Sequence, residues 1–349
     1  MTPFIGPEQL MREGGHPHIL RLGANESAFG PSPKAIAAMA GELPRLSWYG
    51  DPESYELREV LAARLGCNVD EVLIGSGIDD LMGLAVRAFI GPGSVALATR
   101  GTYPTFAYHV TGYGGGLETV DYRPDGTIDI EAVIERAQEL HPGIIYVANP
   151  DNPSGTMCTR AEIELLLEKT PPQTLLLLDE AYAEFAPPRS FMPTIIDARL
   201  MRVRTFSKAY GMAGARIGYG VTTTRNVETF GKIRLQYGVN RNAQIGALAA
   251  LGDEAYTARV IDEVERGREE YYDLARSVGR KTIPSFTNFV CIDYGTASEA
   301  NAVIVDLMSR GVFIRKPFAP PLDGYIRVTV GTASERSEFA EHLRAVRPQ

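Results

Sequence analysis

Short, continuous apolar runs that end in polar or glycine-containing loops constrain the fold of this chain most strongly. The clearest lie at 143–148 and 175–178, and further runs lie at 71–74 and 94–98. Strands that are apolar throughout are typical of sheets covered on both faces. Segments with helical spacing alternate with these runs, at 34–39, 54–65, 81–89 and 160–168. The alternation predicts an α/β fold whose large domain has a mostly parallel, doubly wound sheet.

The C-terminal third has a different pattern. Residues 226–272 predict one long helix that crosses to a second unit. Shorter strands and helices are then expected at 289–292, 299–310, 312–315, 325–330 and 334–344. We therefore predict an irregular N-terminal arm (1–30), a large domain (31–245) and a smaller α/β C-terminal domain (246–349), with the arm packing near the smaller one.

Composition excludes several classes of function. The 349 residues carry a net charge of −8, which argues against general nucleic-acid binding. No apolar run approaches the ~20 residues of a membrane span, and no signal-peptide pattern opens the chain, so we expect a cytoplasmic protein. The three cysteines, Cys67, Cys158 and Cys291, are widely spaced, which favours reduced thiols and no metal site.

Lys208 is the strongest candidate for chemistry. It lies in 204–218, a loop rich in small residues that follows an apolar run. A lysine amine can form a Schiff base with a carbonyl group when its surroundings lower its pKa. Thr205, Ser207 and Arg216 could hold a phosphate beside it. A surface lysine on a glycine-rich turn would give the same local pattern.

Other polar loops follow the predicted strands. Gly77 lies in a strand–turn–helix segment that could present backbone N–H groups to an anion, or could be a simple turn. Tyr103 follows another strand and could stack on a flat cofactor or cap the core. Asn152 lies in a rigid loop with two prolines. Asp179 ends a four-leucine strand, where it needs a cationic partner, unless it caps a helix or pairs with an arginine.

Three motifs in this order carry a resemblance. N-P-D-N-P-S-G begins at Asn149, D-E-A-Y begins at Asp179, and S-K-x-x-G-x-x-x-x-R-x-G begins at Ser207. Together they resemble pyridoxal-5′-phosphate (PLP)-dependent aminotransferases of fold type I over nearly the whole chain. N-E-x-x-F-G-P-S-P from Asn25, the Y-x-D-P turn from Tyr49, D-E-A-Y-x-E-F and I-R-V-T-V-G-T resemble the histidinol-phosphate aminotransferase branch.

The resemblance implies roles for the loop residues. Lys208 would bind the cofactor as a Schiff base and later move a proton as general base and acid. Asp179 would keep the pyridine nitrogen protonated, and Tyr182 and Asn152 would bind the 3′-oxygen. Tyr103 would lie on the ring face, with Phe106 as the alternative. The remaining cofactor-binding residues would hold the phosphate, namely Gly77, Ile78, Asp79, Thr205, Ser207 and Arg216.

The resemblance also implies substrate contacts. Arg327 would bind the substrate carboxylate, and Tyr49 would come from the neighbouring subunit of a homodimer. Arg315 would either bind a substrate phosphate or lie on the domain surface. Phe4 stands where this branch often has a tyrosine that contacts the substrate phosphate, which weakens the expectation of a phosphorylated substrate. Asp151 stands where an asparagine is more usual, at little expected cost.

We therefore expect a PLP-dependent aminotransferase that acts on histidinol phosphate, with 2-oxoglutarate as the other substrate. An aromatic or broad-range amino acid aminotransferase would use the same site. A PLP-dependent decarboxylase or lyase is a further alternative, but Arg327 favours retention of the carboxylate. A non-catalytic PLP-binding module is the alternative from another class.

Overall fold

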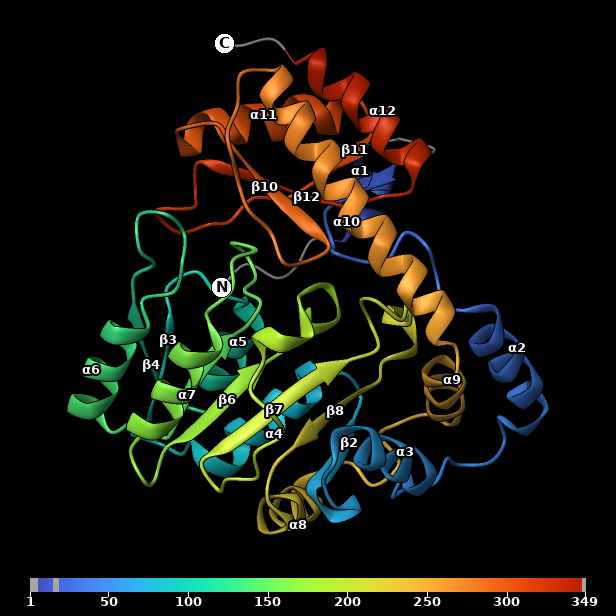
Figure 1. Cartoon of the computed structure of the whole chain (residues 1–349), viewed down its shortest axis with the longest axis vertical. Coiled ribbons are helices and arrows are strands. Elements are labelled where there is room, and N and C mark those ends of the chain that lie inside the picture. The colour runs from blue at the N-terminus through green and yellow to red at the C-terminus, as the bar shows by residue number, and fades with distance from the viewer. Residues whose placement is uncertain (1–5, 15–18, 347–349) are drawn as a thin grey trace.

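The computed structural model describes residues 6–14 and 19–346. Its largest sheet has seven strands in the order β2-β8-β7-β6-β5-β3-β4 (Figure 1). The strands are β2 (Val72–Gly75), β3 (Val95–Thr99), β4 (Gly116–Val120), β5 (Ile144–Ala148), β6 (Leu175–Asp179), β7 (Leu200–Thr205) and β8 (Gly218–Val221). Five of them, β4, β3, β5, β6 and β7, pair in parallel, whereas β8 is antiparallel to both β7 and β2. The prediction of a mostly parallel sheet is confirmed.

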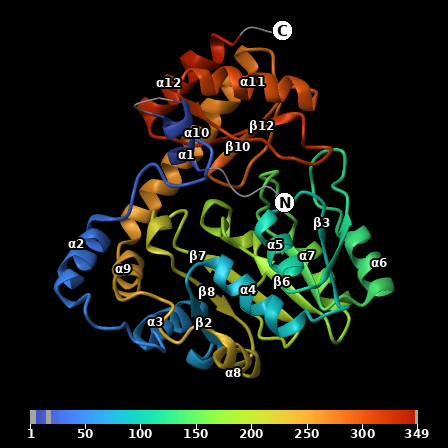
Figure 2. The same cartoon turned by 180° about the vertical axis from the view of Figure 1, so that it is seen from behind.

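Helices cover both faces of this sheet (Figures 1 and 2). Alternate residues of each strand face opposite sides, so Ile144 and Tyr146 of β5 join one core cluster, and Ile145 and Val147 join another. The first cluster includes α4 (Ile78–Phe89) and α5 (Pro104–Gly112). The second includes α6 (Ile130–Leu140) and α7 (Arg160–Lys169). The sheet is therefore doubly wound, as predicted.

The predicted long helix at 226–272 is wrong. The structure has three helices there, α8 (Thr224–Ile233), α9 (Arg241–Leu251) and α10 (Glu254–Ser277). Asn240 separates the first two, because its extended backbone and its side chain, which accepts from the N–H of Ala243 at 2.8 Å, start a new helix. Gly252 separates α9 from α10. In Figure 1, α10 runs from the large sheet toward the C-terminal elements.

The C-terminal elements form a smaller α/β unit. Its three-stranded antiparallel sheet has the order β12-β10-β9. The elements are β9 (Thr282–Ile283), β10 (Phe289–Asp293), α11 (Ala297–Ser309), β11 (Val312–Phe313), β12 (Tyr325–Thr329) and α12 (Ala333–Arg344). One apolar cluster runs from the large sheet into this unit. The domain boundaries stay a prediction, and the one at 245/246 falls inside α9.

The N-terminal arm is more regular than predicted. It contains α1 (Pro7–Gly14) and β1 (Leu20–Arg21), and β1 pairs in parallel with β11 of the C-terminal unit. Helices α2 (Pro33–Glu42) and α3 (Tyr55–Leu65) follow it. Phe4 lies outside the described residues. Among the residues described, none of the helices has both the length and the apolar character needed to cross a membrane.

Candidate active site

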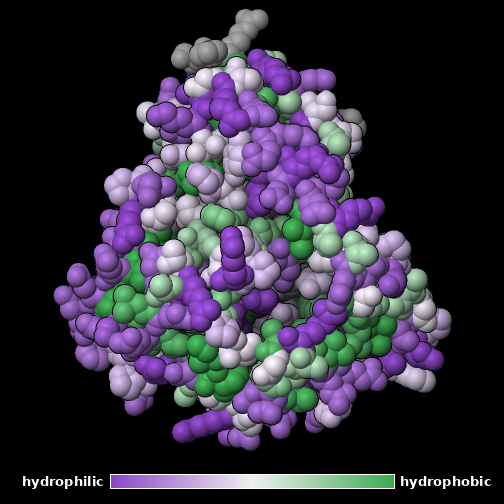
Figure 3. Space-filling view, viewed as in Figure 1, coloured by the Kyte–Doolittle hydropathy of each residue, from purple (hydrophilic) through white to green (hydrophobic). Residues whose placement is uncertain are grey.

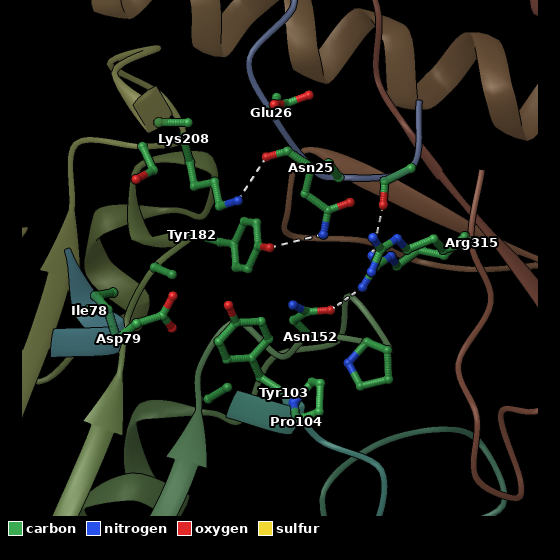
Figure 4. A pocket seen from close by; sticks show the side chains of 18 of the residues that line it. Asn25, Glu26, Ile78, Asp79, Tyr103, Pro104, Asn152, Tyr182, Lys208 and Arg315 are labelled. Carbon is green, nitrogen blue, oxygen red and sulfur yellow. Dashed lines mark hydrogen bonds between the residues drawn. The ribbon is translucent and has the colours of Figure 1, made fainter. Parts of the chain in front are cut away.

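A pocket of about 570 Å³ lies where the parallel strands end and the arm and β12 approach them. Figure 4 shows its lining side chains, which come from segments far apart in the sequence. The pocket brings together most of the predicted site residues: Ile78, Asp79, Tyr103, Asn152, Asp179, Tyr182, Thr205, Ser207, Lys208, Arg216, Arg315 and Arg327.

Asp179, the last residue of β6, is a buried carboxylate in the pocket lining. It accepts a hydrogen bond from the Tyr146 hydroxyl at 2.8 Å and from the N–H of Ala181 at 3.0 Å. Burial raises its pKa to about 6. Two arginines of β7 pair with the neighbouring Glu180 instead. Among residues 6–14 and 19–346, Asp179 therefore forms no ion pair with an arginine, which was the alternative considered, and a cation in the pocket would stabilise its charged form.

Lys208 lies three residues after the end of β7. Its Nζ donates to the backbone oxygen of Asn25 at 2.9 Å and lies 5.6 Å from the ring centre of Tyr182 (Figure 4). Burial, and then the nearby charge of Arg327, lowers the pKa of Lys208 to about 8. A substantial fraction of the amine is therefore neutral and nucleophilic near physiological pH.

The N-terminus of α4 forms one side of an anion site. Gly77 caps this helix with φ +86°, and a Cβ built there would lie 2.6 Å from Nη2 of Arg216. Only glycine therefore lets the helix start and the guanidinium approach each other this closely. The N–H groups of Ile78 and Asp79, at the first two helical positions, have no intrahelical acceptor.

Two hydroxyls complete the anion site. Thr205 Oγ1 donates to Ser207 Oγ at 2.9 Å, and the Ser207 N–H donates to Thr205 Oγ1 at 3.0 Å. Both side chains line the pocket with Arg216. Hydroxyls, free N–H groups and a guanidinium are the donors that a phosphate prefers.

Arg327 of β12 connects the C-terminal unit to residues 149–156, the loop after β5 that we call the proline loop. Its Nη1 donates to Asn152 Oδ1, and its Nη2 donates to the backbone oxygen of Gly23 at 3.2 Å. Its buried Nε has no hydrogen-bond partner among the described residues. The backbone of Arg315 forms an antiparallel bridge with Arg327, and the Arg327 N–H donates to the Arg315 oxygen at 2.6 Å. Arg315 and Arg327 are therefore paired across this bridge, and both residues line the pocket.

Three aromatic residues considered at the sequence level lie in different places. Tyr103 lines the pocket. Phe106 is buried inside α5 and stacks on Tyr146 at 4.7 Å, so Tyr103 is the candidate for stacking on a cofactor ring. Tyr49 is not among the lining residues of this chain's pocket; it is 76% exposed and stacks on Tyr237 at 4.5 Å.

Sequence reasoning missed Asn25 as a site residue and did not predict the contacts of Asp151. Asn25 touches both Lys208 and Tyr182, and its place in the N-E-x-x-F-G-P-S-P motif is the signal that could have indicated it. Asp151 is only 1% exposed, and its Oδ2 accepts from the N–H and hydroxyl of Ser154 and from the Tyr122 hydroxyl.

The donor set matches the functional groups of PLP. The anion site suits a phosphate, the buried carboxylate of Asp179 suits a protonated ring nitrogen, and the neutral fraction of Lys208 suits an aldehyde. A Cβ at position 77 would crowd the Arg216 guanidinium, so glycine there keeps this donor beside the start of α4. Fold and site together define a PLP-dependent enzyme of fold type I.

Comparison with known proteins narrows the class. The sequence model of the family described as aminotransferase class I and II matches residues 17–343. Histidinol-phosphate aminotransferase 2 of Carboxydothermus hydrogenoformans is 33% identical over 97% of this chain and 94% of its own length. The Bacillus subtilis histidinol-phosphate aminotransferase is 31% identical over the same shares of the two chains.

A solved structure supports the same family. The histidinol-phosphate aminotransferase from Sinorhizobium meliloti, in complex with PLP, superposes with a TM-score of 0.95 and 39% identity, covering 99% of this chain and 96% of that one. The chain belongs to the class I and II aminotransferases, and it is a PLP-dependent transaminase.

Proposed function

We propose that this transaminase moves an amino group from histidinol phosphate to 2-oxoglutarate. The observation that carries this proposal is the pair of adjacent guanidinium groups, Arg315 and Arg327, in the pocket that contains Lys208. Burial, and then the charge of Arg327, lowers the pKa of Arg315, so an anion between the two groups would relieve their repulsion. The phosphate of one substrate and a carboxylate of the other can each supply that anion. The names of the relatives support this choice of substrate.

We assign the chemical work to Lys208. When bound, PLP supplies an aldehyde for amines and a ring that takes up the electrons of a carbanion. The Lys208 amine holds the cofactor, and once free it removes the proton from the substrate carbon that bears nitrogen. Its lowered pKa suits it to both accepting and returning that proton.

The other pocket residues bind and orient the cofactor in this proposal. Asp179 would pair with the ring nitrogen and keep it protonated, while Tyr182 and Asn152 would bind the 3′-oxygen and Tyr103 would cover the ring. The phosphate lies in the anion site formed by Gly77, Ile78, Asp79, Thr205, Ser207 and Arg216.

A panel of amino donors tests the substrate. We expect the absorbance of the bound cofactor to change at least about tenfold faster per molar with histidinol phosphate than with phenylalanine or tyrosine, a preference that one charge-assisted hydrogen bond can supply. Glutamate, the amino form of 2-oxoglutarate, should also react, because it is the donor of the reverse half-reaction. Arg315→Met should weaken this preference, and Arg100→Met, an exposed arginine outside the pocket lining, serves as the control. Equal rates for histidinol phosphate and phenylalanine would reject the proposed substrate.

An aromatic or broad-range amino acid aminotransferase remains the second candidate. Phe318, which is 63% exposed and lines the same pocket, offers an aromatic surface that could contact a phenyl or imidazole ring. A faster rate with phenylalanine in the same panel would select this candidate. Release of carbon dioxide from an amino acid, in place of a 2-oxo acid product, would select the decarboxylase alternative.

We also propose that the active unit is a homodimer in which Tyr49 reaches the neighbouring subunit's pocket. An exposed apolar surface supports this, and Figure 3 shows hydrophobic surface over the region of α2, α3 and α9. Exposed apolar residues in and beside these helices include Ile36, Leu43, Leu46, Trp48, Tyr49, Tyr55, Leu235 and Tyr237. Exposed aromatic residues in such numbers are typical of interfaces.

A cytoplasmic location is part of the proposal. The three cysteines form no disulfide in the structure, which suits a reducing compartment. Cell fractionation with an antibody to the chain would test it, and recovery outside the cytoplasmic fraction would contradict it.

A further inference from the structure

Within the described ranges 6–14 and 19–346, the arm residue Asn25 forms hydrogen bonds with both Tyr182 and Lys208. Its side-chain Nδ2 donates to the Tyr182 hydroxyl at 3.0 Å, and its backbone oxygen accepts from Lys208 Nζ at 2.9 Å (Figure 4). Asn25 is buried and its φ is +53°, a left-handed conformation that asparagine tolerates better than most residues. The residue is therefore held in a defined position at the pocket wall.

Thr329 of β12 fixes the orientation of the Asn25 amide. Its Oγ1 donates to Asn25 Oδ1 at 3.1 Å and accepts from the Asn25 N–H at 3.1 Å. Because Oδ1 is taken by this hydroxyl, Nδ2 must point toward Tyr182. Thr329 lies two residues after Arg327 on the same strand, so the two side chains lie on the same face of β12. The strand that carries the anion-binding Arg327 therefore also sets the direction of the Asn25 amide.

The hydrogen bond from Asn25 affects what the Tyr182 hydroxyl can do. Burial raises the pKa of Tyr182 to about 12, while the charge of Arg327 and the bond from Asn25 act in the opposite direction. A phenol that accepts a bond from an amide keeps its own hydrogen for a second acceptor, and it becomes a stronger donor. In the proposed function that second acceptor is the 3′-oxygen of PLP.

We propose that Asn25 is a positioning residue that links β12, through Thr329, to the hydrogen-bonding strength of the Tyr182 hydroxyl at the cofactor. The inference rests on the proposed roles of Tyr182 and Lys208. It assigns to the N-terminal arm a part in tuning the cofactor, beyond covering the pocket.

The test follows the visible absorbance band of the PLP-loaded protein as a function of pH. Without the Asn25 amide, Tyr182 is a weaker donor to the cofactor oxygen, which favours the protonated form of the chromophore. Asn25→Ala should therefore raise the midpoint of the absorbance change by roughly 0.5 to 1 pH unit. Thr329→Val keeps the amide but frees its orientation, so it should move the midpoint in the same direction by less. In a Tyr182→Phe background, Asn25→Ala should cause no further shift.

Asn288→Ala is the matched control. Asn288 Nδ2 donates to the backbone oxygens of Asn25 and Glu26 at 3.2 and 3.3 Å, so this change loosens the arm without removing the bond to Tyr182. It should lower the melting temperature but leave the midpoint in place. An unchanged midpoint in Asn25→Ala, or an equal shift in the Tyr182→Phe background, would overturn the inference. A wild-type protein that forms no visible band with PLP would overturn the proposed function and this inference with it, so the two failures are distinguishable.

Discussion

At the scale of single residues, burial shifts the pKa values of both Lys208 and Asp179. Lys208, in the loop after β7, and Asp179, at the end of β6, both line the pocket, where burial disfavours whichever form of a group is charged. Burial therefore lowers the pKa of the amine to about 8 and raises that of the carboxyl to about 6. Each group is left near the pH at which it can change its protonation state or respond to a bound charge.

The lowered pKa of Lys208 predicts how fast the cofactor binds at different pH values. Only the neutral amine attacks an aldehyde, so the rate of PLP binding to the cofactor-free protein should rise with pH around a midpoint near 8. Arg327→Met removes a positive charge that lowers this pKa, so the midpoint should move upward. Stopped-flow absorbance measures both rates, with Arg100→Met as control. A wild-type midpoint near 10.5, the ordinary value for lysine, would contradict the buried amine.

At the scale of elements, the proline loop between β5 and α7 places Asn152 against Arg327. Asp151 holds this loop from inside, because three donors converge on its Oδ2. The expectation that aspartate in place of the more usual asparagine costs little stays a prediction. An aspartate in a buried site with three donors contributes to stability through all of them.

Substitution of Asp151 tests the loop. Asp151→Ala leaves three buried donors without their acceptor, so it should lower the free energy of unfolding by about 2–4 kcal/mol and weaken substrate binding through Asn152 and Arg327. Asp151→Asn keeps one oxygen and should cost about 1 kcal/mol or less. Tyr122→Phe removes a single donor and serves as the control. Urea denaturation measures these differences, and an alanine variant as stable as wild type would show that the loop does not depend on this carboxylate.

Sequence could predict β3, β5 and β6 because each is a continuous apolar run that needs cover on both faces, as at 175–178, whereas β4, with the partly exposed sequence G-L-E-T-V, was not predicted. The prediction of one helix across 226–272 overlooked residues 234–240, R-L-Q-Y-G-V-N, which are not helical in the structure and whose Gly238 and Asn240 are local signals of a break. The strand β8 also has no predicted counterpart, since two of its four residues, G-Y-G-V, are glycines, which are depleted in strands, and pairing with β2 and β7 holds it.

The candidate site shows the same limit. Loops that directly follow strands could be placed at one sheet edge from the order of motifs, which is how Lys208, Asp179 and Asn152 could be predicted together. Asn25 could not, because its contacts are with residues more than 150 positions away and depend on how β12 meets the large sheet. The choice between Tyr103 and Phe106 as the stacking residue also needed the structure. Helix α5 begins directly after Tyr103 and buries the ring of Phe106.

At the scale of the whole molecule, the proposed homodimer makes a prediction that a monomer cannot meet. Tyr49→Phe and Lys208→Ala should each have low activity as pure variants. If Tyr49 acts in the neighbouring subunit, a mixed dimer of the two variants contains one pocket with both native residues. Unfolding and refolding an equal mixture should then restore about a quarter of wild-type activity, since half of the dimers are mixed and each has one intact site.

Two controls make this result interpretable. The mixed sample is compared with each variant refolded alone, and analytical ultracentrifugation confirms the dimer. Activity no higher than that of Tyr49→Phe alone would mean that Tyr49 acts within its own subunit, and a monomer in the centrifuge would reject the homodimer.

The central claim is that the amine of Lys208 holds the cofactor in this pocket. Reduction of the PLP-loaded protein with borohydride makes that bond permanent, and mass spectrometry of the digested protein locates it. We predict one phosphopyridoxyl group per chain, on the peptide that contains Lys208, and none in Lys208→Ala. The same label on a different lysine, with Lys208 unmodified, would contradict the account.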